Sequence, residues 1–121
     1  MKSFFAIIAL FACVTITYGQ TNATVDQLKK IYSEKVSWKD AGELSYDEAT
    51  RTLSIKNFRL PMTENTNIRA EKSEVHFAMQ KGTTVTDAND PSWKRAEFII
   101  PFADKKSAGE FVKLISRLKE N

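Results

Sequence analysis

The chain has 121 residues, of which 42% are apolar and 11% are aromatic, and its formal charge is +3 at pH 7. This length fits one domain that buries roughly 65% of its unfolded surface. Lys and Arg alternate with Asp and Glu along the chain, whereas nucleic-acid binding needs a concentrated basic surface, so nucleic acid is not an expected partner.

The first 19 residues have the pattern of a secretory signal peptide. The basic start Met1–Ser3 precedes the apolar run Phe4–Val14, and small residues stand near a cleavage point after Gly19. The run is too short to cross a bilayer as a permanent helix. We therefore expect cleavage, export to the periplasm or the cell exterior, and no integral membrane insertion.

Cys13 offers an alternative at the same end, because it could be the lipidated residue of a lipoprotein. It is the only cysteine in the sequence, and cleavage after Gly19 would remove it. The mature chain would then have no disulfide, no thiolate metal site and no thiol nucleophile.

A loose leader is expected over Gln20–Ala23, followed by a single domain over residues 24–121. Thr24 and Gln27 are spaced as a capping box for a first helix, whose buried face is predicted to contain Val25, Leu28, Ile31 and Tyr32. Period-two alternation and turn residues predict strands over 43–46, 51–58, 68–81 and 95–102, with residues 83–85 extending the pairing and a polar loop over 87–92.

The last segment predicts an amphipathic helix. Asp104 or Ser107 can cap it, with Glu110 completing a capping box from Ser107. One broad apolar face is expected to pack on the sheet and contains Ala108, Phe111, Val112, Leu114, Ile115 and Leu118.

Residues for catalysis or metal binding are sparse, and no catalytic residue, metal or cofactor is predicted. His76 is the only histidine, and its strand places it on the polar side, away from a buried nucleophile. The segment from Asp87 begins like a calcium loop but has Ser92 where the glycine is needed and Phe98 where the glutamate is needed. A turn rich in Asp and Asn explains this segment. Carboxylates that leave a small hydrolase open as an alternative are Glu43, Asp47, Glu48, Glu71, Glu74 and Glu97.

The best candidate for binding is the run Trp93, Lys94 and Arg95. An exposed loop tryptophan beside two cations is typical of an interface or the lip of a ligand site. The alternative is that Trp93 folds back as a lid on the core.

These elements predict an α+β domain with an N-terminal helix, a curved antiparallel sheet of five to seven strands and a C-terminal helix packed on the sheet. The layout, and above all Arg95–Phe102 leading into Asp104–Leu118, resembles a pleckstrin-homology-like module with its half-open barrel or sheet. The resemblance implies a scaffold for binding, without the basic phosphoinositide pocket of some members.

We therefore expect a small exported, non-catalytic module that binds a protein or another envelope component. The alternatives are the carboxylate-dependent hydrolase and a carrier that encloses an apolar ligand between the sheet and the terminal helix.

Overall fold

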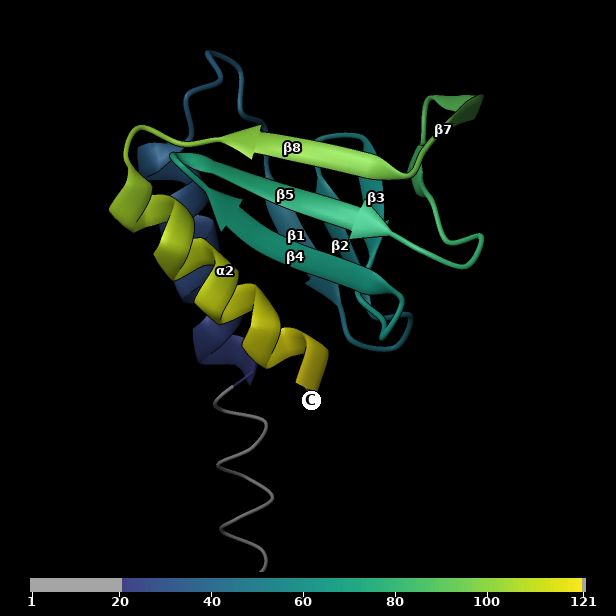
Figure 1. The fold of residues 1–121 in the computed structure, drawn as a ribbon, viewed down its shortest axis with the longest axis horizontal. Helices are drawn as coiled ribbons and strands as arrows, with labels where there is room; N and C mark the ends of the chain where they lie inside the picture. Colours follow the sequence, from purple (N-terminus) through teal and green to yellow (C-terminus); the bar gives the residue numbers. More distant parts are fainter. Residues whose placement is uncertain (1–20, 121) are drawn as a thin grey trace, which may run out of the picture.

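The computed structural model describes residues 21–120, and this segment folds into two antiparallel sheets with one helix before the strands and one after them (Figure 1). The predicted signal peptide, Gln20 of the predicted leader and Asn121 lie outside the described residues. The expected α+β class, with antiparallel strands between an N-terminal and a C-terminal helix, is confirmed.

Eight strands form two sheets, rather than the single sheet of five to seven strands that was expected. The five-stranded sheet has the order β1-β2-β3-β6-β7, and its strands are β1 (Leu44–Asp47), β2 (Thr52–Ile55), β3 (Phe58–Pro61), β6 (Val85–Asp87) and β7 (Asp90–Arg95). The three-stranded sheet has the order β4-β5-β8, with β4 (Thr66–Glu71), β5 (Glu74–Met79) and β8 (Glu97–Pro101).

Two of the expected long strands are hairpins. Residues 51–58 turn at Lys56 and Asn57, and residues 68–81 turn at Lys72 and Ser73. Both lysines have a left-handed backbone, with φ of +57°. Short hairpin turns favour Gly or Asn at such positions, so lysine there gave no turn signal in the sequence.

The loop predicted over residues 87–92 is also a hairpin, in which β6 pairs with β7 across Ala88 and Asn89. Pro91 lies within β7, and this is tolerated because β7 is an edge strand that pairs only with β6. Arg95 belongs to β7 rather than to the last strand, and only Ala96 separates β7 from β8.

The N-terminal helix occupies residues 21–35 of the described chain, so the prediction that residues 21–23 form a loose leader is wrong. Thr24 therefore lies inside the helix and is not its N-cap. The reason is packing, because Thr21, Thr24 and Leu28 share one buried face at helical spacing. Of the expected face, Leu28 and Tyr32 are buried, while Val25 and Ile31 are partly buried.

The C-terminal helix α2 (Lys105–Glu120) is capped by Asp104, whose Oδ1 accepts the Ser107 backbone N–H at 2.7 Å. Ser107 is consequently the third residue of the helix, and the capping box between Ser107 and Glu110 is wrong. The hydrogen bonds from Ser107 hold the pKa of Asp104 below its ordinary value.

The core fills the space between the two sheets and beneath both helices. The predicted face of α2 is confirmed, with Val112 the one member that is only partly buried. Side chains with no exposed area include Leu28, Leu53, Ile55, Leu60, Met62, Val75, Phe77, Val85, Ile100, Ala108, Phe111 and Ile115. Within residues 21–120, no helix has both the length and the apolar character that crossing a membrane requires.

Candidate functional site

Four aromatic rings lie in consecutive contact where the two sheets meet, and we call this set the aromatic row: Trp38, Phe98, Phe58 and Trp93. Ring centroids are 6.0 Å apart for Trp38 and Phe98, 5.1 Å for Phe98 and Phe58, and 5.1 Å for Phe58 and Trp93. Tilted and edge-on contacts at these distances are favourable between aromatic rings. The row joins four separate parts of the chain into one continuous line of ring contacts.

Each ring is positioned by a different element. Phe58 opens β3 directly after the Lys56 turn, Phe98 lies in β8, and Trp93 lies in β7. Trp38 follows the N-terminal helix, and the backbone before it is fixed to the end of β8, because the Ser37 N–H donates to the Pro101 carbonyl at 2.8 Å.

The two tryptophans form the ends of the row, and each has a cation over its ring. Lys56 Nζ lies 5.2 Å from the Trp38 ring centroid, and the guanidinium carbon of Arg95 lies 5.2 Å from that of Trp93. Both tryptophans are partly buried against the core, and Phe98 between them is 8% exposed. Cation–π contacts at such half-exposed sites contribute about 0.5–1 kcal/mol each.

Of the three residues predicted for binding, Trp93 and Arg95 come together and Lys94 does not. Side chains alternate along a strand, so Lys94 projects from the opposite face of β7 and is exposed. Trp93 packs back on Phe58, as the core-lid alternative expected, yet part of its ring stays accessible.

The sequence does not predict the contact at the Trp38 end of the row, because Trp38 and Lys56 are far apart in the chain and no local pattern relates them. Their contact depends on Gly42, which has φ of +66° and where a Cβ would come within 2.7 Å of Lys56 Cγ. The same loop is held to the helix by the Tyr32 hydroxyl, which donates to the Ala41 carbonyl. Burial, with a smaller contribution from the Asp40 carboxylate, raises the pKa of Tyr32 to about 12.

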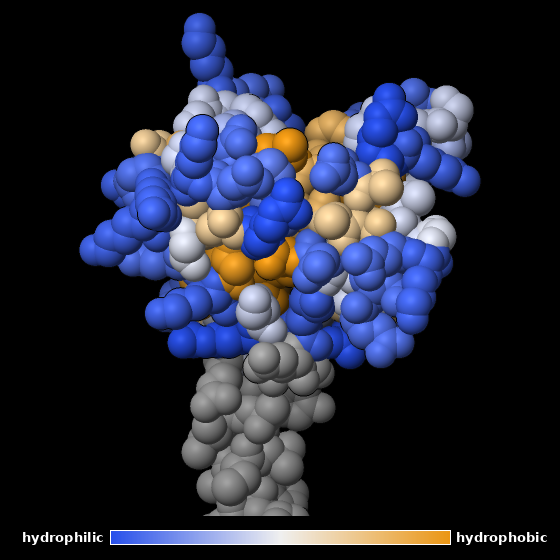
Figure 2. Space-filling model, viewed as in Figure 1, coloured by the Kyte–Doolittle hydropathy of each residue, from blue (hydrophilic) through white to orange (hydrophobic). Residues whose placement is uncertain are grey.

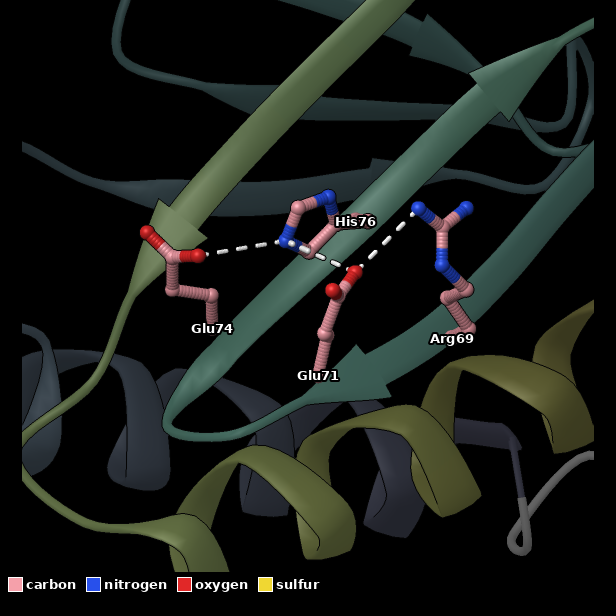
Figure 3. A network of polar contacts seen from close by, with 4 residues as sticks. All are labelled: Arg69, Glu71, Glu74 and His76. Carbon is pink, nitrogen blue, oxygen red and sulfur yellow. Dashed lines mark hydrogen bonds and ion pairs between the residues drawn. The ribbon is translucent and has the colours of Figure 1, made fainter.

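Apart from the aromatic row, a cluster of polar side chains lies on the outer face of the three-stranded sheet (Figure 3). His76 Nε2 is 3.2 Å from Glu74 Oε1 and 3.8 Å from Glu71 Oε2, and Arg69 also contacts Glu71 at 3.3 Å. The His76 side chain is 13% exposed, whereas about half of each charged neighbour is exposed. His76 thus lies on the polar side of its strand, as predicted.

The residues around His76 on this face are partly exposed, although His76 itself is largely covered. On the side of the molecule shown in Figure 2, hydrophobic atoms gather near the centre and hydrophilic side chains surround them. On this sheet Ile99, which pairs with His76 in register, is 40% exposed. No cluster of three or more His, Cys, Asp or Glu residues suited to a metal ion was found within residues 21–120.

The remaining acidic residues are dispersed. Glu43, Asp47 and Glu48 are exposed around β1, and Glu97 is exposed on β8. The turn rich in Asp and Asn is confirmed, since Asp87 Oδ1 accepts the Asn89 N–H at 2.8 Å. The structure therefore brings only Glu71 and Glu74 of the six candidate carboxylates together, around His76.

No protein-family model, curated protein or solved structure matches this chain.

Proposed function

We propose that the protein is a small exported, non-catalytic module that binds a protein or another envelope component at the aromatic row. The observation that carries this proposal is the state of the two tryptophans. Each is anchored in the core by ring contacts, keeps part of its surface accessible and has a cation beside it. Rigid, partly buried Trp and Arg side chains are the groups that dominate binding energy at protein interfaces.

The position of the row favours a macromolecular partner. Trp93 and Arg95 lie on β7, an edge strand whose other residues are exposed. A partner seated there would cover the tryptophan and could also pair with the free edge of the strand.

A non-catalytic role is supported by where the reactive groups lie. His76 and its two glutamates lie on the outer face of the three-stranded sheet, where about half of each glutamate is exposed, and the polar contacts of His76 within residues 21–120 are with these two carboxylates rather than with a hydroxyl nucleophile. The resemblance to pleckstrin-homology-like modules stays a prediction, and it contributes only the idea of a binding scaffold.

Capture from the native envelope fraction tests this function. The chain from Gln20 is immobilised as wild type, as Trp93→Ala and as Arg95→Glu, with Arg69→Ala as a matched control on the other sheet. We expect one partner to be retained by the wild type and the control and lost by both row variants. Equal retention by all four proteins would show that the row is not the binding surface.

Fluorescence provides an independent readout once a partner is identified. The chain has two tryptophans, and both belong to the aromatic row. Trp38→Phe leaves Trp93 as the single probe, so binding at the β7 end should shift its emission. An unchanged spectrum at saturating partner would contradict the proposal.

Export is tested by the mass of the protein recovered from cells. We expect an N-terminus at Gln20, which leaves 102 residues of the 121. A hydrophobic adduct on an N-terminal Cys13 would instead support the lipoprotein alternative.

A further inference from the structure

A groove of about 460 Å³ runs between the N-terminal helix and α2, and we call it the interhelical groove. It is formed by one face of each helix. Its lining residues recur at helical spacing, from Gln27 to Lys35 on the first helix and from Ser107 to Arg117 on α2. This volume falls within the range of small-molecule sites.

The floor of the groove is formed by two apolar side chains, one from each helix. Ile31 from the first helix is partly buried, and Leu114 from α2 is 7% exposed. Beneath them, Phe111 and Ile115 have no exposed area, so the space between α2 and the sheet is filled by core side chains. A ligand would therefore lie on top of these two side chains, outside the sheet and helix interface that the sequence suggested for a carrier.

Charged side chains form the walls. Four are cations, Lys30, Lys35, Lys113 and Arg117, and two are carboxylates, Glu34 and Glu110, which leaves an excess of two positive charges. The ion pairs of the described chain involve other residues, on the outer face of the three-stranded sheet. Lys30, Lys113 and Arg117 are thus available to an anion, whereas Lys35 also interacts with the Asp104 carboxylate.

We propose that the interhelical groove binds an anionic amphiphile with a single hydrocarbon chain. The chain lies along Ile31 and Leu114, two side chains that together offer apolar contact for one hydrocarbon chain, and the anionic head lies among the cations. The apolar floor gives affinity that rises with chain length, and the positive walls select an acidic head over a neutral one. This inference is independent of the aromatic row, because neither tryptophan lines the groove.

Calorimetric titration with octanoate, decanoate and dodecanoate, each below its micelle concentration, tests the proposal. We expect roughly twofold tighter binding per added methylene, because a chain lying on the groove floor is covered on one side only. The variant Lys113→Gln with Arg117→Gln should bind dodecanoate about tenfold more weakly. The matched control is Lys105→Gln, an exposed lysine of α2 outside the groove, which should bind as the wild type does.

Backbone amide shifts locate the ligand. The largest dodecanoate-induced changes should fall in residues 27–35 and 107–117. Binding of acetate as tight as that of dodecanoate would show that the floor plays no part, and equal binding of a neutral dodecyl glycoside would show that the walls play none. Either result overturns the proposal, as does an undiminished affinity in the double variant.

Discussion

The buried hydroxyl of Tyr32 should make the stability of this protein fall at high pH. The residue is 1% exposed, and its hydroxyl donates a hydrogen bond to the Ala41 carbonyl. In Tyr32→Phe the ring is kept, including its contact with Trp38, but Ala41 loses its donor. The free energy of unfolding of this variant at pH 7 should be lower by about 1 kcal/mol.

The sign of this difference should reverse in alkali. The folded protein holds the pKa of Tyr32 at about 12, against 10.0 for an ordinary tyrosine. A raised pKa means that the stabilisation is complete below pH 10 and is lost as the pH rises toward 12, because the unfolded chain releases the proton first. A pKa that is raised by about two units corresponds to about 3 kcal/mol of stability, and this exceeds the roughly 1 kcal/mol that the lost hydrogen bond contributes. The variant should then be the more stable protein above about pH 11.

Urea unfolding at pH steps from 7 to 11.5 measures both curves. The other titrating groups are common to the two proteins, so only the difference between the curves reports on Tyr32. Curves that stay parallel across this range would refute the reasoning, since they would mean that the phenol ionises as easily in the folded protein as in the unfolded chain.

Three further changes test other parts of the structure. Lys72→Gly should raise the free energy of unfolding by about 0.5–1 kcal/mol, because glycine relieves the left-handed backbone at φ +57°; a lower melting temperature would contradict this. Phe111→Ala should cost about 3–5 kcal/mol in urea unfolding, because the ring is fully buried against Phe102; a cost below about 1 kcal/mol would show that α2 is not firmly packed. Asp104→Ala should lower the melting temperature at neutral pH, and the deficit should shrink below pH 3.8, because the lowered pKa of Asp104 means that its stabilisation is lost as the carboxylate is protonated. A deficit independent of pH would show that its charge is not involved.

The polar and apolar spacing along the chain was informative for α2 and for β5. The face of α2 from Ala108 to Leu118 and the alternation of Val75, Phe77 and Met79 were predicted and are buried. Strand breaks were predicted less well, since lysines occupy the left-handed positions of the Lys56 and Lys72 turns. A hairpin can impose that backbone on a lysine when cross-strand pairing supplies the energy, and this leaves no trace in composition.

In the candidate site, too, the contacts between residues close in the chain were predicted and the contacts between separate elements were not. Trp93 and Arg95 were found from their proximity in the chain, and they do meet. Trp38, Phe58 and Lys56 were missed, because their contacts join separate elements: Lys56 of the turn before β3 lies over Trp38, and Phe58 of β3 packs on Phe98 of β8.

The sequence by itself determined the class of the fold, the buried face of α2 and the scarcity of groups for covalent or metal chemistry, because these depend on residue type and on spacing within one element. Only the tertiary structure decided that the strands divide between two sheets, that Asp104 rather than Ser107 caps α2, that the tryptophans end one row of rings, and that cations from two helices face a common groove. Each of these depends on the distance between side chains from separate elements, which packing sets and local periodicity does not.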